Sequence, residues 1–197
     1  MSNLNTHYKQ YFKYLLSVTL VAAVCFSSYA DASKKQIEMV RTVDNKILEL
    51  KGTGRYKFMS LIKVVDGKFY LEAGAKPEEA LLDNAKQLEL YYHLSIKAKD
   101  FAKVTHQGIA RNIPRAEYLK LAGKIDQFNK FYRDVKKGDR YTLTYIPGKG
   151  TTLALNNKEL GTLEGADFAS GLYSIWLGQK EPMDDDFRDD LLTKVVK

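Results

Sequence analysis

An arginine that follows two glycines is the first group in this chain that could do chemistry. Gly52-Thr53-Gly54-Arg55 stands at the start of an apolar run. The planar fork of a guanidinium suits either a phosphate or a carboxylate. A dinucleotide-binding fingerprint needs a third glycine and a helix directly after it, and a Walker loop needs Gly-Lys-Ser/Thr, so nucleotide binding is not indicated. The open alternatives for Arg55 are a ligand carboxylate and a structural Asp or Glu.

Other groups that could do chemistry are few. His93 and His106 lie on different predicted elements without a carboxylate at ligand spacing, whereas zinc sites usually show tighter pairs. The acidic run Asp184–Asp186 is typical of a helix N-terminus. The chain has no Gly-x-Ser-x-Gly motif, and Cys25 is its single cysteine. The sequence therefore predicts no metal site, no cofactor and no identifiable catalytic residue.

The first 32 residues have the pattern of a secretory signal peptide. Lys9 and Lys13 precede an uncharged apolar run over residues 15–26, and Ala30-Asp31-Ala32 matches an A-x-A cleavage site. The run is short for a membrane span, so a retained anchor is the less favoured alternative. We expect a cleaved signal peptide at 1–32, one domain over 33–197, no stable membrane anchor after cleavage, and a periplasmic or secreted location.

Composition describes a globular domain with a basic surface. Hydrophobic residues make up 45% of the chain, prolines number four, and the net charge is +7 at pH 7. The lysines are scattered, without an arginine-rich run interleaved with aromatic residues, which argues against a nucleic-acid partner. A solvated surface is the simplest interpretation of the charge. Attraction to anionic lipid or an envelope polymer is the alternative.

Hydrophobic periodicity gives the strands of the N-terminal half. A short strand is expected over residues 46–50, and the β-forming runs KFMSLIKVV and KFYLE follow. Asp66-Gly67 between these runs is a hairpin signal, although one long strand bent at a bulge is also compatible with it. Residues 88–94 alternate between apolar and polar, with Tyr92 on the apolar side, which predicts a half-buried strand.

The remaining elements alternate in blocks. Ser95 is expected to cap a helix with Phe101, Val104 and Ile109 on its apolar stripe. A second helix should follow Pro114, with an apolar stripe of Leu119, Ala122, Ile125 and Phe128. Turn signals over residues 138–157 predict three antiparallel strands. A core helix over 167–177 and a final helix after residue 182 complete the order. Strands, helices, strands and helices in succession define an α+β class.

These blocks together resemble the chalcone isomerase-like proteins of bacteria, in an exported branch. The stretches GTGRYKF…KVVDGKFYLE, then DVKKGDRYTLTYIPGKGTTLALNNKELGTLEGADFASGLYSIWLG, then FRDDLL carry the resemblance over residues 48–192. It implies an open-faced β-sandwich, in which a large antiparallel sheet is covered by a layer of helices. It also implies one long bent strand through Asp66-Gly67 in place of a hairpin, and a ligand cleft between sheet and helices.

The resemblance also implies two kinds of function. Plant members of the wider family cyclise chalcones: an arginine stabilises the anion, a threonine and a tyrosine hydrogen-bond the ketone through water, and an asparagine and a hydroxyl residue position the substrate. Other members bind fatty acids in the same cleft without catalysis, with the arginine holding the carboxylate. Carried onto this chain, these positions fall on Arg55, Val65, near Asp100, near Gln107, and near Ser174 or Ile175.

Val65 has no hydroxyl, so the implied polarisation of the ketone is lost, and this is usually a large term in such catalysis. We therefore expect a non-catalytic binder of a small amphipathic acid such as a fatty acid. Its tail would lie against Tyr92, Leu94, Phe101 and Val104, and its head group near Arg55. Two alternatives stay open: an isomerase (intramolecular lyase) acting on an unknown enone or phenolic compound, and an envelope module that binds an unknown protein partner.

Overall fold

The computed structural model describes residues 39–193, and the predicted signal peptide at residues 1–32 lies outside them. The strands are β1 (Val40–Val43), β2 (Lys46–Phe58), β3 (Ile62–Glu72), β4 (Lys86–Tyr92), β5 (Arg140–Ile146), β6 (Gly150–Leu155) and β7 (Lys158–Leu163). The helices are the short η1 (Pro77–Glu79), then α2 (Ala98–Asn112), α3 (Arg115–Asn129), α4 (Ala166–Leu177) and α5 (Asp185–Thr193).

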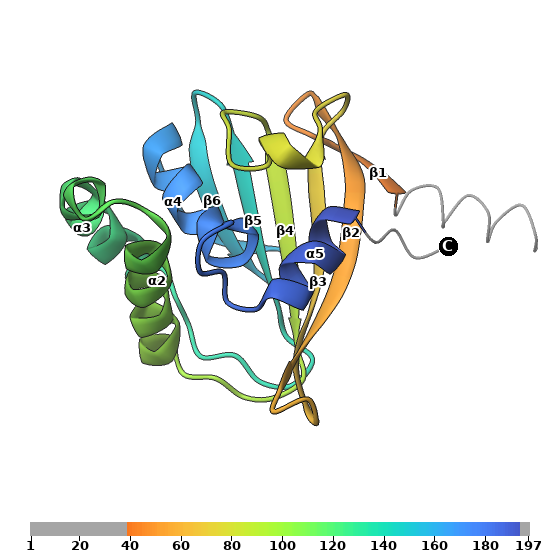
Figure 1. The fold of residues 1–197 in the computed structure, drawn as a ribbon, viewed down its shortest axis with the longest axis vertical. Coiled ribbons are helices and arrows are strands. Elements are labelled where there is room, and N and C mark those ends of the chain that lie inside the picture. The colour runs from red at the N-terminus through yellow and green to blue at the C-terminus, as the bar shows by residue number, and fades with distance from the viewer. Residues whose placement is uncertain (1–38, 194–197) are drawn as a thin grey trace, which may run out of the picture. The chain divides into compact units, whose positions relative to one another are not determined.

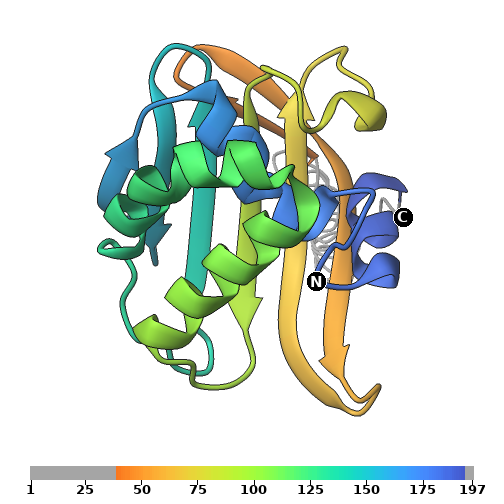
Figure 2. The same cartoon turned by 60° about the vertical axis from the view of Figure 1, so that its left-hand side comes forward.

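The strands form one sheet of seven, and their order in space is their order in the chain. Each pair from β2–β3 to β6–β7 is antiparallel. The helices α2 and α3 leave the sheet after β4 and return the chain to β5, which lies beside β4. The helices pack on one face of the sheet (Figures 1 and 2). The predicted α+β class, with an antiparallel sheet under a layer of helices, is confirmed.

The long bent strand through Asp66-Gly67 is confirmed, since both residues lie inside β3. The chain instead reverses at Met59–Ser60, within a run expected to be strand, where both residues have positive φ angles of 51° and 60°. The strand predicted over residues 46–50 continues to Phe58. Two glycines before an apolar run favour a tight turn, but Gly52 and Gly54 both lie inside β2, so that interpretation is wrong.

The glycines of β2 make room for the last helix. A Cβ built on Gly52 would lie 2.1 Å from the carbonyl oxygen of Asp190, and one on Gly54 would lie 2.8 Å from the ring of Phe187. Gly67, which pairs with Gly54 across the strands, meets the same ring at 2.6 Å. Such distances are far inside van der Waals contact, so any larger residue would push α5 away from the sheet.

Strand β4 lies inside the sheet and is buried on both of its faces. Leu88 and Leu90 lie toward the helices, while Gln87 and Glu89 on the opposite side are only 7% and 2% exposed. Arg41 of β1 donates hydrogen bonds to both of these polar side chains, so the sheet curls and brings its first strand over the second face. The predicted half-buried strand is therefore wrong, because β1 covers its polar side.

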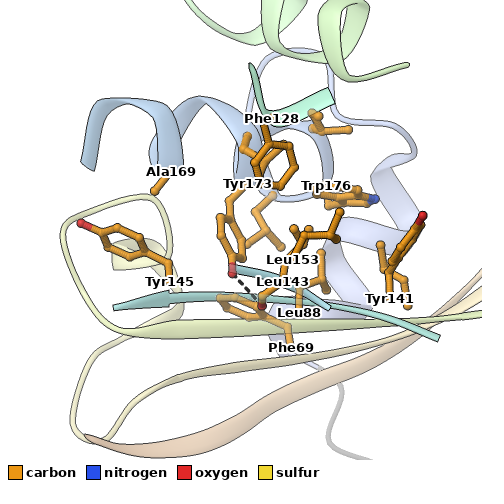
Figure 3. Packing of buried hydrophobic residues seen from close by; sticks show 14 of the residues in the cluster. Phe69, Leu88, Phe128, Tyr141, Leu143, Tyr145, Leu153, Ala169, Tyr173 and Trp176 are labelled. Carbon is orange, nitrogen blue, oxygen red and sulfur yellow. Dashed lines mark hydrogen bonds between the residues drawn. The ribbon is translucent and has the colours of Figure 1, made fainter. Parts of the chain in front are cut away.

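The main core lies between the sheet and the helices. In Figure 3, Tyr173 of α4 reaches down to the sheet, and its hydroxyl donates a 2.9 Å hydrogen bond to the carbonyl of Leu143. Phe69, Leu88 and Phe128 are fully buried in the same cluster. Burial of each large apolar side chain contributes about 1.5–3 kcal/mol. The expected core position of α4 is confirmed.

Two helix details differ from expectation. Helix α2 starts after Lys97 instead of Ser95, because the carboxylate of Asp134 accepts a 2.9 Å hydrogen bond from the backbone N–H of Ala98 and so replaces the expected serine cap. The apolar stripe of α3 omits Leu119, which is 60% exposed, and uses Leu121 in its place.

Candidate functional site

A cavity of about 320 Å³ lies between one end of the sheet and the helices α2 and α4. Its floor is made by side chains of three adjacent strands: Tyr56 of β2, Val64 and Val65 of β3, and Leu90 and Tyr92 of β4. Val65, Leu90 and Tyr92 lie on the core side of their strands, whereas Val64 stands at the irregularity of the β2–β3 pairing, between the paired residues Lys63 and Val65. The floor is therefore apolar apart from the two tyrosine hydroxyls.

One wall of the cavity is a single face of α2. Asp100, Val104, Gln107 and Arg111 are spaced by three or four residues and line the cavity together. At about 1.5 Å of rise per residue, Asp100 and Arg111 are separated by roughly 16 Å along the helix axis. A carboxylate therefore lies at one end of this wall and a guanidinium at the other.

The second wall comes from the C-terminal part of the domain. Ile175 and Trp176 of α4 line the cavity, and so does the segment from Glu181 to Met183 that follows the helix. Asn112, at the end of α2, fixes this segment, since it donates to the carbonyl of Glu181 at 2.7 Å and accepts from its backbone N–H at 3.1 Å. The two walls are thus held together at the end where Arg111 lies.

Arg111 is exposed, and it makes no ion pair with any carboxylate among residues 39–193. Glu181 is the acidic residue that lines the same end, and its backbone carbonyl and N–H form hydrogen bonds with the side chain of Asn112. An arginine without a partner at the rim of an apolar cavity can accept the acidic head group of a ligand whose chain lies inside.

Tyr92 supplies a neutral hydroxyl within the cavity. Its ring packs edge-on against Phe101 at 5.4 Å and against Tyr141 at 5.9 Å. Burial raises the pKa of the Tyr92 phenol well above its ordinary value. The group therefore remains protonated and can act as a hydrogen-bond donor, but not as a base at neutral pH.

Arg55, the predicted head-group anchor, does not line the cavity. It lies on the opposite face of the sheet, where its Nη2 donates to Oδ2 of Asp66 at 2.8 Å in a two-pronged ion pair. Nε2 of His93 lies 2.9 Å from the same carboxylate. The geometry is that of the alternative interpretation, in which Arg55 pairs with a structural carboxylate. The neighbouring residue Tyr56 faces the cavity instead.

The other predicted site residues divide into two groups. Val65, Tyr92 and Gln107 come together in the cavity lining. Ser174 does not, because its hydroxyl is buried and donates to the carbonyl of Gly171 at 2.6 Å, although Ile175 next to it does line the cavity. Three of the four residues proposed for the tail, Tyr92, Phe101 and Val104, also line it, whereas Leu94 is not among the lining residues.

Sequence reasoning missed Arg111, Trp176 and Met183. A signal for Arg111 was present in the helical spacing that places it on the face of Val104 and Gln107. Trp176 was expected in the core, and it is 8% exposed there while it also lines the cavity. Among residues 39–193, no group of three or more metal-ligating side chains occurs, and no helix is long and apolar enough to cross a membrane.

The fold and the cavity define an α+β domain with a ligand-sized, mainly apolar site between its sheet and its helices. The chain belongs to the chalcone isomerase-like family, whose sequence model matches residues 30–193. Among similar solved structures is a fatty-acid binding protein from Arabidopsis thaliana, with 14% identity and a TM-score of 0.60 over 77% of this chain and 89% of that one. At this identity the likeness shows the fold alone. No curated protein matches the chain in sequence.

Proposed function

We propose that this protein binds a small amphipathic acid, such as a fatty acid, without catalysis. The observation that carries the proposal is an apolar cavity with Arg111 at its rim. Within residues 39–193, Arg111 has no carboxylate partner. The structurally similar Arabidopsis thaliana protein is itself a fatty-acid binding protein, which supports the same ligand class. Arg111 takes the anchoring role that the sequence assigned to Arg55.

The cavity volume indicates the size of the ligand. At about 320 Å³ it lies near the lower limit of the ~300–1,000 Å³ that is usual for small-molecule sites. We therefore propose that shorter acyl chains bind more tightly than long ones. Long chains would have to leave the cavity at the exposed side of Val104, which is 44% exposed.

The isomerase alternative gains no support from the cavity. Val65 and Asp100, which stand at or near the threonine and tyrosine positions of the plant enzymes, both line it. Neither side chain carries a hydroxyl that could polarise a ketone, and the hydroxyl of Tyr92 stands at neither of these two positions. We therefore include no chemical step in the proposed function.

Binding is tested by calorimetry and native mass spectrometry with saturated fatty acids of increasing chain length. Arg111→Gln should weaken binding by about 1.5–3 kcal/mol, the usual contribution of a hydrogen bond to a charged group. Val104→Trp should block the cavity at a position that is already part-exposed, and so should abolish binding while the protein stays folded. Arg115→Gln, at an exposed arginine outside the lining, is the matched control. Unchanged affinity in Arg111→Gln and Val104→Trp would contradict the proposal.

We also propose that the protein is exported, in an exported branch of its family, and acts in the periplasm or outside the cell. The support is the sequence pattern of residues 1–32. N-terminal sequencing of the protein recovered from a periplasmic extract should begin at or near Ser33. Recovery of the uncut chain from the cytoplasm would contradict export.

A further inference from the structure

The turn between β2 and β3 carries four exposed apolar side chains in five residues. Phe58, Met59, Leu61 and Ile62 are 52%, 75%, 85% and 53% exposed. In both views this hairpin reaches further than the neighbouring loops at its end of the sheet (Figures 1 and 2). Other exposed large apolar residues in the described part of the chain, such as Leu82 and Leu119, are isolated in the sequence. Single residues of that kind are normal, whereas a cluster of them marks an interaction site.

The conformation of this turn is unfavourable for its residues. Three turns of the described chain have two successive non-glycine residues at positive φ: Asp44–Asn45, Asn156–Asn157 and Met59–Ser60. Asp and Asn tolerate the left-handed region because their short polar side chains bond locally, whereas Met does not. Stability therefore favours Asn at position 59, and the sequence instead places a large apolar side chain at the tip.

The base of the tip is unfavourable in a second way. Lys57 and Lys63 pair directly across the two strands, and like charges in this position repel. Both are exposed, and neither has a carboxylate partner within residues 39–193. Asp134 and Asp139, in the loop before β5 at the same end of the sheet, are already bonded to Lys97 and to Asn156 respectively. The apolar tip is thus backed by uncompensated positive charge.

We propose that this hairpin, Lys57–Lys63, inserts its apolar tip into the surface of an anionic lipid bilayer. Apolar side chains at the point and lysines behind them match the two layers of such a surface, because the tip enters the acyl boundary while the ammonium groups meet the phosphates. A second protein surface would need an acidic apolar groove, and a second copy of this basic tip would repel the first. The inference does not depend on what the cavity holds. It does place a membrane contact beside the cavity, since Tyr56 and Val64 flank the lysines and line it.

A local probe tests the insertion without interference from residues 1–38. In the full chain with Cys25→Ser, an environment-sensitive fluorophore is attached at Leu61→Cys or, as a matched control, at Leu119→Cys on α3. Vesicles of phosphatidylcholine with phosphatidylglycerol should blue-shift and brighten the label at 61 and leave that at 119 unchanged. No response at 61, an equal response to pure phosphatidylcholine, or a response to protein concentration without vesicles would each overturn the proposal, the last in favour of self-association.

Two variants separate insertion from misfolding. Met59→Asn should raise the melting temperature by about 2–4 °C, because it removes an apolar residue from the left-handed region, and it should weaken the vesicle response at the same time. Lys57→Gln/Lys63→Gln should weaken binding to anionic vesicles roughly thirty-fold, with Lys120→Gln as the control. Undiminished vesicle binding in these tip variants would overturn the proposal.

Discussion

The two faces of the sheet are held by different kinds of interaction. Toward the helices lie aromatic and aliphatic side chains, and the cavity opens among them. On the other face, the buried carboxylate of Glu89 accepts hydrogen bonds from Arg41 at 3.0 Å and from Arg140 at 3.0 Å, and Gln87 continues the network. Strand β4 contributes to both faces in alternate positions.

A single strand, β4, thus contributes both to the ligand cavity and to the framework of the sheet. Apolar packing does not depend on the direction of each contact, so part of the space between the sheet and the helices can stay unfilled and form a cavity. The polar face is directional, and its ion pairs join β1 to β4, which are not neighbours in the sheet. The polar network therefore fixes the curl of the sheet, while the apolar face is free to adapt to a ligand.

Removal of Glu89 should break the polar face and give the largest effect. Glu89→Ala leaves Arg41 and Arg140 without their shared partner, whose side chain is 3% exposed, and we expect a loss of about 3 kcal/mol in the free energy of unfolding. Urea denaturation measures the change. Glu49→Ala is the control, since Glu49 pairs with Lys51 on the surface and should cost below about 1 kcal/mol. Equal losses for the two variants would contradict the difference between buried and exposed carboxylates.

Lys86 is the exception on the apolar face, and its removal should stabilise the protein. It is fully buried, and burial lowers the pKa of its ammonium to about 8. Between pH 8 and the ordinary value of 10.5, the unfolded chain binds more protons than the folded one, so stability rises with pH across this window. Lys86→Met should therefore gain about 2 kcal/mol at pH 7. That gain should shrink as pH approaches 10.

Denaturation of wild type and Lys86→Met at pH 7 and pH 10 measures this dependence. Lys46→Met serves as the control, because Lys46 forms a part-exposed pair with Glu72. A destabilised Lys86→Met at pH 7 would show that the hydrogen bond from its ammonium to the carbonyl of Leu82 outweighs the cost of burial.

The smallest effect is expected at Arg55, on the polar face. Its side chain is 44% exposed, so Arg55→Met should cost at most about 1 kcal/mol and leave fatty-acid binding unchanged. Arg55 is the main cause that lowers the pKa of the Asp66 carboxyl. The stabilisation is therefore present above the ordinary pKa of aspartate, and it disappears as pH falls through the lowered value. Thermal melts of the wild type and of Arg55→Met at pH 7 and near pH 3 measure this difference in stability. Weaker fatty-acid binding by Arg55→Met would contradict this interpretation, because it would indicate that Arg55 contacts the ligand.

The parts of the fold that the sequence predicts are those governed by local signals. The strands from residue 140 to 163 are separated by turns at Gly138, Gly148 and Asn156–Asn157. These residues have positive φ angles, which Gly and Asn adopt more readily than other residue types, so the turns could be predicted from the sequence. Val65 and Gln107, which were predicted from the family resemblance, are among the residues that line the cavity. The floor of the cavity also needed pairing between strands, which no local pattern supplies.

Arg55 shows why the rest could not be predicted. Strand β2 has irregularities between Leu50 and Gly52 and between Tyr56 and Lys57, and each shift alters which face later residues occupy. A count of alternating residues therefore cannot tell whether Arg55 or Tyr56 faces the helices. The Met59–Ser60 turn was missed for a related reason, because neither residue type is usual at positive φ.

The sequential order of the strands has a consequence for how this domain can change over evolution. Since β4 and β5 are neighbours, α2 and α3 amount to a long insertion within a single β-hairpin. The register of the sheet does not depend on the residues between them, yet α2 supplies one wall of the cavity. Lengthening, shortening or replacing this excursion can therefore alter what the domain recognises while the strand pairing is inherited intact.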